Sequence, residues 1–144
     1  MSVQKILKVK GEGPIVTIDP GATVGDAAQL LSSRRIGALI VSRDGKHVDG
    51  ILSERDIVRE IGKRGAICLG DTVEQVMTRK IVSCTVHDNA VEMLHKMTDG
   101  RFRHMPVMEG EVMVAVISIG DAVKMRLGEL EMENNALEAM IRGR

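Results

Sequence analysis

Apolar and polar residues alternate in a regular order along the first third of the chain. The apolar run at 15–18 predicts a short strand, and the Pro-Gly pair behind it predicts the strand's end. Thr23 and Asp26 have the spacing of a helix N-cap, and the apolar positions that follow recur at helical intervals. We therefore expect a strand and then an amphipathic helix that ends near residue 37.

Two further β-rich runs follow this helix, at 38–41 and 48–52. Residues 43–46 between them, Arg-Asp-Gly-Lys, have the composition of a hairpin turn. Ser53 then precedes a second amphipathic segment, which should end in the glycine-containing stretch 62–65. The predicted order is β-α-β-β-α, an α+β arrangement with its helices on one face of the sheet.

The same order occurs a second time, because residues 15–41 align with residues 81–107 without a gap. Identical pairs in this alignment include Ile15/Ile81, Val16/Val82, Arg35/Arg101 and Val41/Val107. After a turn that is one residue shorter, the register resumes with Ser53/Ser118 and Asp56/Asp121. Short helical lead-in segments, SVQKIL and TVEQVM, precede the two copies. The chain is thus a tandem of two similar units.

Each half would bury too little surface to be stable alone. We expect the two β-α-β-β-α repeats to pack face to face about a pseudo-twofold axis, leaving matched clefts between them. The expected division is 1–66 for the first repeat with its lead-in helix, 67–126 for the second repeat, and 127–144 for a C-terminal amphipathic extension helix.

Composition and charge narrow the functional classes. The chain has 144 residues, and its 20 basic and 20 acidic residues give a formal net charge of zero. A neutral chain lacks the positive field of nucleic-acid or acidic-membrane binders. One Phe and no Trp or Tyr leave no aromatic platform for stacking bases. Ten Met residues are expected to fill the core instead.

The cysteines and the hydropathy pattern favour a cytoplasmic location. Cys68 and Cys84 form no CxxC pattern, which favours a reducing compartment over a disulfide framework. The first residues, MSVQKILKVKGEG, contain no apolar core of a signal peptide, and no run approaches 18 apolar residues. We expect neither secretion nor membrane insertion.

A Ser-x-x-Asp motif stands in both repeats where a strand runs directly into a helix, at Ser53–Asp56 and Ser118–Asp121. One interpretation is a capping box, in which the hydroxyl and the carboxylate satisfy backbone N–H groups. The other is a ligand site. A carboxylate at this place can accept hydrogen bonds from two ribose hydroxyls, and the helix N-terminus favours a phosphate. The sequence leaves both open.

The chain resembles a stand-alone tandem pair of CBS (cystathionine β-synthase) domains of the bacterial type. The resemblance covers about residues 2–125 and rests on the element order and on the segments GILSERDIVR, GRFRHMPV and VISIGDAVK. It implies clefts that bind AMP, ADP, ATP, S-adenosylmethionine or NAD(H). It also implies that Asp56 with Ser53 holds the ribose in one cleft, and Asp121 with Ser118 in the other.

The resemblance implies further site residues. Backbone groups of the first strand of each repeat would read the adenine edge, and the segment before the second strand would complete the wall. In the first repeat these residues are Val16, Thr17, Ile36, Gly37 and Ala38, and in the second Lys80, Val82, Ser83, Arg103, His104, Met105 and Pro106. Arg101, Arg103 and His104 are suited to a phosphate, and Arg55 is the cation of the first repeat.

The second repeat departs from the family pattern at one position. Ala115 stands where the first repeat has Gly50. If close backbone approach requires Gly there, the second cleft is altered, and we expect the two sites to differ in ligand preference.

The sequence offers few candidates for a metal site or a catalytic site. His87 and His95 lack metal-ligand spacing, and Cys84 occupies a strand position that suits a small core residue better than a nucleophile. No catalytic set of nucleophile, base and orienting group can be assembled. We therefore expect no enzyme, no catalytic cofactor and no metal.

The last segment carries an apolar stripe of Val123, Leu127, Leu130, Leu137 and Ile141. It can fold back on its own repeat, mediate homodimerisation, or dock on a target protein. The favoured hypothesis is a homodimeric regulatory module that senses energy or redox state through an adenine nucleotide and acts through a partner protein. The alternative is a structural homodimerisation or interaction module with vestigial clefts. The ligand, the occupancy of the clefts, the target and the direction of the dimer stay open.

Overall fold

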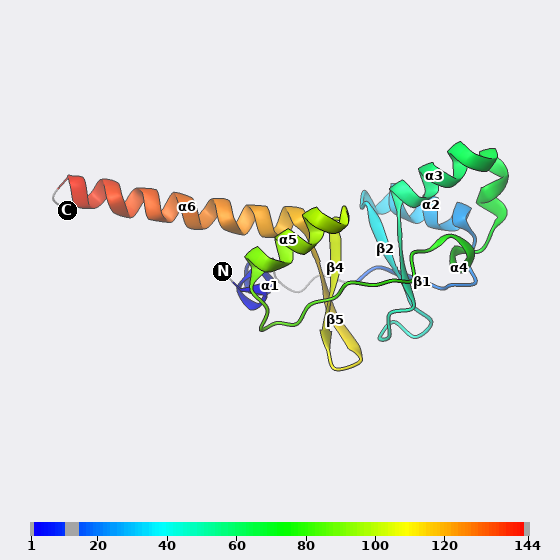
Figure 1. Ribbon diagram of the computed structural model, residues 1–144, viewed down its shortest axis with the longest axis horizontal. Coiled ribbons are helices and arrows are strands. Elements are labelled where there is room, and N and C mark those ends of the chain that lie inside the picture. The colour runs from blue at the N-terminus through cyan, green and yellow to red at the C-terminus, as the bar shows by residue number, and fades with distance from the viewer. Residues whose placement is uncertain (1, 11–14, 143–144) are drawn as a thin grey trace. The chain divides into compact units, whose positions relative to one another are not determined.

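The computed structural model describes residues 2–10 and 15–142 as a mixed α+β structure (Figure 1). Its helices are α1 (Val3–Lys10), α2 (Val24–Arg34), α3 (Glu54–Arg64), α4 (Val73–Val76), α5 (Ala90–Gly100) and α6 (Ile119–Ile141), with a 3-10 helix at Gly65–Gly70. Its strands are β1 (Thr17–Ile18), β2 (Ala38–Val41), β3 (Gly50–Ser53), β4 (His104–Glu109) and β5 (Val112–Ser118). The predicted α+β class with two repeats is confirmed.

The contacts divide the described chain into two compact units. The β1–β3 unit contains residues 15–83 and 108–114, and the α6 unit contains 2–10, 84–107 and 115–142. The predicted boundaries at 66 and 126 follow the sequence repeats and stay predictions. The contacts group the lead-in segments differently, because each lead-in helix packs on the repeat that it does not precede.

In the β1–β3 unit, a three-stranded sheet packs against helices. β1 pairs parallel with β2, and β2 pairs antiparallel with β3. The β-branched and aliphatic residues of these strands turn one face toward α2, whose buried positions recur at helical spacing. The core of the unit contains Ile18, Val24, Ala27, Leu31, Leu39, Val41, Leu52, Ile57, Val73 and Met77.

The predicted cap of α2 is confirmed. The Thr23 hydroxyl accepts from the Asp26 N–H at 3.0 Å, and the Asp26 carboxylate accepts from the Thr23 N–H at 3.3 Å. The helix ends at Arg35, whose left-handed φ of 54° turns the chain toward β2. The equivalent Arg101 ends α5 in the same way, with a φ of 57°.

The helix α4, which precedes the second repeat, binds the first. The Val73 N–H donates to the Ala22 carbonyl at 2.8 Å, and the Glu74 N–H donates to the Pro20 carbonyl at 3.0 Å. These bonds hold α4 against the segment that precedes α2, and the Val73 side chain is fully buried in the core.

The helix α1, which precedes the first repeat, binds the second in the same geometry. The Val3 N–H donates to the Asp88 carbonyl and the Gln4 N–H donates to the Val86 carbonyl, both at 3.1 Å. Both acceptors lie 66 positions after those that α4 uses. The crossed packing explains why the contacts group α1 with residues of the second repeat.

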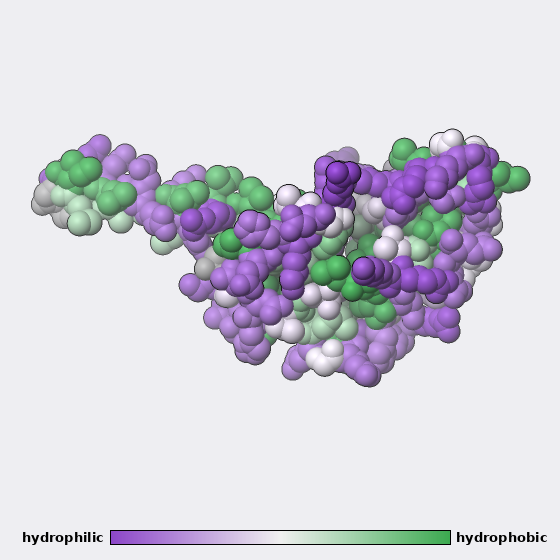
Figure 2. Space-filling model, in the orientation of Figure 1, coloured by the Kyte–Doolittle hydropathy of each residue, from purple (hydrophilic) through white to green (hydrophobic). Residues whose placement is uncertain are grey.

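The α6 unit has a methionine-rich core. Met93, Met97 and Met105 are at most 1% exposed, as are Ile6 and Ile117 of the same unit. Methionines thus contribute to the core as predicted, although Met132 and Met140 are exposed. The helix α6 packs on α1 and α5 and runs on beyond them (Figure 1). Hydrophobic residues also lie at the surface along α6 (Figure 2).

The first strand of each repeat is shorter than predicted. The run 15–18 forms strand only at Thr17–Ile18, and the run 81–84 forms a single parallel bridge between Cys84 and Val107. The Cys84 N–H donates to the Pro106 carbonyl at 3.0 Å, but Pro106 has no N–H to return to the preceding segment. The proline therefore interrupts the ladder.

Gly50 lies against the chain at the end of α4. A Cβ at this position would meet the Met77 sulfur at 2.5 Å and the Thr78 carbonyl oxygen at 2.9 Å. Ile51 beside it exchanges two backbone hydrogen bonds with Thr78, at 2.8 and 3.0 Å. The glycine that distinguishes the first repeat thus allows two backbone segments to pack closely.

We predict that Gly50→Ala lowers the free energy of unfolding by about 1–3 kcal/mol, because the added methyl overpacks a site bounded by backbone. Gly62→Ala is the matched control, because nothing lies within 4 Å of its added Cβ in α3. The control should raise stability by about 0.5–1 kcal/mol. Urea denaturation measures both, and a Gly50→Ala protein as stable as the unmodified chain would contradict the packing account.

Candidate functional site

Ser53 and Asp56 form a complete capping box at the start of α3. The Asp56 carboxylate accepts from the Ser53 N–H at 2.9 Å and from the Ser53 hydroxyl at 3.1 Å, and the Asp56 N–H donates to the Ser53 hydroxyl at 3.3 Å. Arg59 donates to the other carboxylate oxygen at 3.2 Å. Asp56 is only 7% exposed. The capping interpretation of the motif is therefore realised in the first repeat.

Ser118 and Asp121 repeat this geometry at the start of α6. The Ser118 N–H donates to the Asp121 carboxylate at 2.9 Å, and the Asp121 N–H donates to the Ser118 hydroxyl at 3.0 Å. Asp121 is half-buried and makes further polar interactions. A carboxylate offers about four acceptor positions, so its role as a cap is compatible with a role in ligand binding. The ribose assignment stays a prediction.

The predicted wall segments lie beside these two helix starts. The Glu54 N–H donates to the Gly37 carbonyl at 2.9 Å, and Ala38 pairs with Ser53 across the sheet. In the α6 unit, the Ile119 N–H donates to the Arg103 carbonyl at 2.8 Å. Each Ser-x-x-Asp motif is thus hydrogen-bonded to the segment that was predicted to line the same site.

The two units contain different sets of predicted site residues. The β1–β3 unit contains Val16, Thr17, Ile36, Gly37, Ala38, Ser53, Arg55, Asp56, Lys80, Val82 and Ser83. The α6 unit contains Arg101, Arg103, His104, Met105, Pro106, Ser118 and Asp121. Lys80, Val82 and Ser83 therefore group with Asp56 and not with Asp121, because the preceding segment is bonded to β3 through Thr78.

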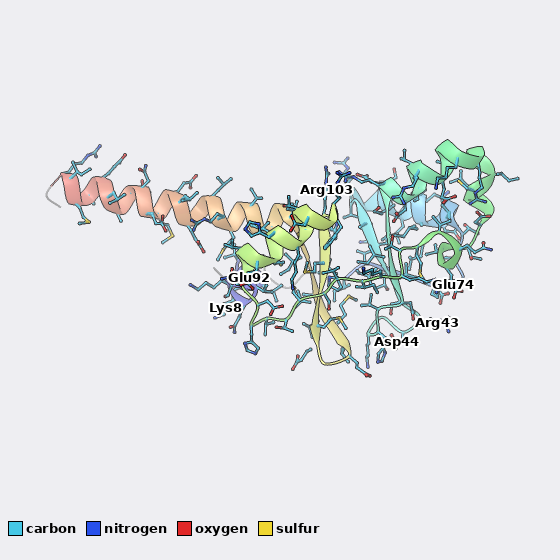
Figure 3. All side chains as sticks on the ribbon, in the orientation of Figure 1. Lys8, Arg43, Asp44, Glu74, Glu92 and Arg103 are labelled. Carbon is cyan, nitrogen blue, oxygen red and sulfur yellow. The ribbon has the colours of Figure 1, made fainter. Side chains whose placement is uncertain are left out.

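The side chains in these sets differ in exposure. Arg101 and Arg103 are exposed between α5 and β4, and His104 beside them is half-buried (Arg103 is labelled in Figure 3). Arg55 is exposed on the first turn of α3. Met105 and Pro106 are buried in the α6 unit, so their side chains contribute to its core. The α6 unit thus combines one carboxylate at a helix start with three neighbouring basic residues.

Cys84 is buried as predicted, at 3% exposure. Its sulfur lies 4.0 Å from the Met93 sulfur and 3.8 Å from the Pro106 carbonyl oxygen. Burial raises the pKa of the Cys84 thiol to about 11, which disfavours the thiolate that a nucleophile needs. Cys84 is a core residue.

Residues 2–10 and 15–142 contain neither a metal-binding cluster nor a helix that could cross a membrane. No group of three His, Cys, Asp or Glu side chains in these ranges is placed to hold a metal ion. No helix within them is both long and apolar enough to cross a membrane.

Comparison with known proteins identifies similar chains. The family model described as "CBS domain" matches residues 12–63 and 73–128. The CBS domain-containing protein CBSX3, mitochondrial, of Arabidopsis thaliana is 31% identical over 149 residues, which cover 99% of this chain and 72% of that protein. Other relatives from the same plant are longer, and matched segments span 19% to 24% of their length.

Solved structures show the same fold. The CBS-domain containing protein ATU1752 from Agrobacterium tumefaciens is 38% identical, with a TM-score of 0.83, and the match covers 88% of this chain and 99% of that one. The CBS domain protein PAE2072 from Pyrobaculum aerophilum, whose structure is a complex with AMP, is 25% identical. Its TM-score is 0.71, and the match covers 84% of this chain and 89% of that one.

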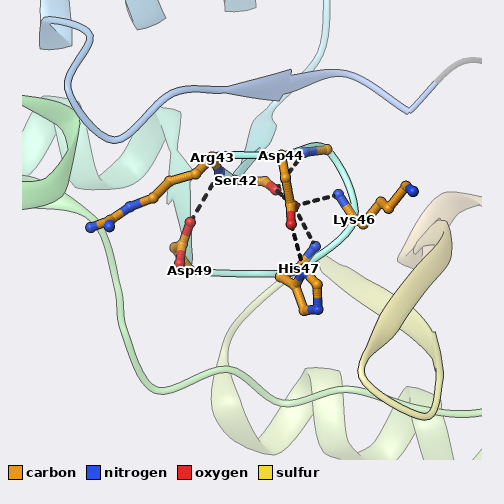
Figure 4. Close-up of polar contacts among 7 residues, drawn as sticks. Ser42, Arg43, Asp44, Lys46, His47 and Asp49 are labelled. Carbon is orange, nitrogen blue, oxygen red and sulfur yellow. Dashed lines mark hydrogen bonds and ion pairs between the residues drawn. The ribbon is translucent and has the colours of Figure 1, made fainter.

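The loop between β2 and β3 contains a polar cluster that sequence reasoning missed (Figure 4). The Asp44 carboxylate accepts from the N–H groups of Lys46 and His47 at 2.8 Å each, and lies 2.5 Å from the His47 ring Nδ1. The backbone bonds and the imidazole hold the pKa of Asp44 well below its usual range, and the carboxylate raises the pKa of His47.

This loop is tied to the rest of its unit. The Lys46 carbonyl accepts from the Met113 N–H at 2.8 Å, and the Arg43 guanidinium lies 3.8 Å from the Glu74 carboxylate of α4 (Figure 3). The Asp-Gly pair predicts the turn, but the contact between Asp44 and His47 depends on how the eight-residue loop closes. The cluster stabilises the loop between β2 and β3.

We predict that Asp44→Asn lowers the pKa of His47 toward its ordinary value, because the side-chain bond to Asp44 is the largest cause of the rise. Because its pKa is raised, His47 stabilises the folded state fully below pH 6.5. This contribution is lost as the pH rises through the pKa of His47 in the folded protein. Because its pKa is lowered, Asp44 stabilises the folded state fully above pH 3.8. This contribution is lost as the pH falls through the pKa of Asp44 in the folded protein.

Imidazole NMR titration measures the His47 pKa directly. Asp49→Asn is the control, because Asp49 acts on His47 only through a weaker Coulombic effect. An unchanged His47 pKa in Asp44→Asn would refute the proposed contact.

Proposed function

Since the chain belongs to the CBS domain family, we propose that it is a regulatory module that binds an adenine nucleotide, either AMP, ADP or ATP, or NAD(H). The observation that carries this proposal is the Asp121 carboxylate at the start of α6, in the same unit as Arg101, Arg103 and His104. The AMP complex of the protein from P. aerophilum supports this ligand class.

The chemistry of the α6 unit fits a nucleoside phosphate. The Asp121 carboxylate accepts hydrogen bonds, as the two ribose hydroxyls require. The N-terminus of α6 carries partial positive charge, and it follows directly from Ser118. Arginine side chains bind phosphate oxygens through paired N–H groups. The chain as a whole has no net charge, so selectivity for an anion has to come from this local set.

The first repeat offers a different set. Arg59 already binds the Asp56 carboxylate, and Arg55 is exposed one residue before it. A ribose at Asp56 therefore competes with Arg59 for an acceptor oxygen. We propose that the two motifs differ in ligand preference, because the basic residues grouped with each of them differ.

The module's output is proposed to pass through other chains. We propose a non-enzymatic homodimer in the cytoplasm that reports energy or redox state, according to its ligand, to a target protein. The ligand changes the conformation only if its affinity differs between two conformations of the module.

Equilibrium titration of the full chain tests ligand binding. Isothermal calorimetry with AMP, ADP, ATP, NADH and S-adenosylmethionine should show saturable binding of at least one of them. Failure of all five would favour the alternative function, a structural homodimerisation or interaction module with vestigial clefts.

We predict that Asp121→Ala weakens nucleotide binding by roughly 1.5–3 kcal/mol, the value of hydrogen bonds to a charged group. Asp26→Ala is the matched control, because Thr23 and Asp26 form the same capping box outside the proposed site. Each substitution should cost about 1 kcal/mol of stability through loss of the cap. Equal nucleotide affinity in both variants would limit Asp121 to capping.

The phosphate assignment predicts a difference between two ligands. Replacing Arg103 and His104 together by Gln should reduce affinity for AMP by at least about tenfold more than affinity for adenosine, because only AMP presents an anion. His95→Gln on α5 is the control, since His95 is exposed and outside the proposed site. Equal losses for AMP and adenosine would mean that the pair shapes the site without contacting phosphate.

A further inference from the structure

The helix α6 has two faces with different surroundings. One face packs on α1 and α5 of its own unit and contains the buried Ala122 and the half-buried Met125 and Glu129. Beyond Glu129 the helix continues for twelve residues to Ile141, and the side chains at 130–138 are all exposed. The packing face therefore covers only the first part of the helix.

The apolar stripe lies on the other face. Its residues remain exposed, with Leu127 at 56%, Leu130 at 44% and Leu137 at 57%, together with Val123 and Ile141. At about 100° per residue, the stripe is centred about a third of a turn from the packing face. The helix does not fold its stripe back on its own unit, so the first of the three interpretations of this segment is wrong for the described chain.

The stripe follows a heptad repeat. Leu127 and Ile141 occupy a positions, and Val123, Leu130 and Leu137 occupy d positions. The remaining a position, between Leu130 and Leu137, is Asn134. One asparagine in an otherwise apolar seam is the device by which two-stranded coiled coils fix their register, at some cost in stability.

We propose that α6 pairs with α6 of a second copy of the chain as a parallel, in-register coiled coil over residues 123–141. In this arrangement the two Asn134 carboxamides face each other and can hydrogen-bond, so that each provides a partner for the polar atoms of the other. In the antiparallel arrangement that covers the same stripe, Asn134 faces a leucine of the second copy and its polar atoms lack a partner. This inference rests on the homodimer in the proposed function and defines its surface and direction.

Flanking charges do not choose between the two directions. In the parallel pair, Arg126 lies near Glu131 of the second copy, whereas Glu133 lies near the second copy's Glu138. The antiparallel pair also contains both kinds of contact. Lys124 attracts Glu138 of the second copy, whereas Glu131 repels Glu131 of the second copy. The asparagine layer therefore decides the direction.

Sedimentation of the full chain tests the surface. The double variant Leu130→Glu with Leu137→Glu should raise the dimer dissociation constant by at least about a hundredfold, because four leucines leave the seam. Met132→Glu is the matched control, since Met132 is 74% exposed on the opposite side of the same turn and should leave the constant unchanged. A monomeric unmodified chain, or no effect of the double variant, would overturn the pairing.

Disulfide formation tests the direction. In Leu127→Cys the two new sulfurs face each other in the parallel pair, but in the antiparallel pair they lie about 15 Å apart along the axis, because residue 127 is opposite residue 137. Mild oxidation should therefore cross-link Leu127→Cys and leave the control Met132→Cys uncross-linked. The native Cys68 and Cys84 are both buried, which keeps them from reacting. A dimer that does not cross-link at 127 would overturn the parallel arrangement.

Nucleotide titration of the double variant separates this inference from the proposed function. The substituted leucines lie outside the proposed site, so the variant should bind AMP as the unmodified chain does. A chain that dimerises through α6 but binds no nucleotide would refute the proposed function and leave the coiled coil supported.

Discussion

Each repeat depends on one hydrogen-bonded junction, the Ser-x-x-Asp box that turns the last strand into the last helix. The serine hydroxyl and the aspartate carboxylate satisfy each other's backbone N–H groups at Ser53–Asp56 and at Ser118–Asp121. At both junctions the next N–H is bonded to the carbonyl at the entrance of the neighbouring strand, Gly37 or Arg103. The junction thus fixes the helix start, the strand end and the proposed ligand wall in one place. The result is a carboxylate at a helix N-terminus in each repeat, buried at Asp56 and half-buried at Asp121.

The crossed lead-in helices are the second constraint. Val3 and Val73 are both fully buried, and each donates a hydrogen bond to the repeat that its helix does not precede. A chain built in this way cannot be cut between its sequence repeats without removing a core residue from one half. The same crossing explains why the contacts group residues in a way that differs from the order of the repeats.

Features encoded by nearby residues could be predicted from the sequence, and features that depend on distant contacts could not. Capping residues and the antiparallel pairing of β2 with β3 rest on spacing and composition, and the structure confirms them. The loop between these strands is longer than the predicted turn, and only some of the methionines lie in the core. The strand expected at 81–84 fails because its partner strand contains Pro106, a neighbour that is distant in the sequence. The role of Gly50 depends on the approach of Thr78. The capping bonds of the candidate site were foreseen as one interpretation, whereas its ribose contact depends on a ligand and stays a prediction.

We propose that the capping carboxylate of α6, Asp121, also binds the ribose of an adenine nucleotide. The most direct measurement is a crystal structure of the full chain grown with AMP. Both ribose hydroxyls should lie within hydrogen-bond distance of the Asp121 carboxylate, while the Ser118 bonds of the capping box persist. Nucleotide density with the ribose away from Asp121, or displacement of the capping box by the ligand, would contradict this proposal.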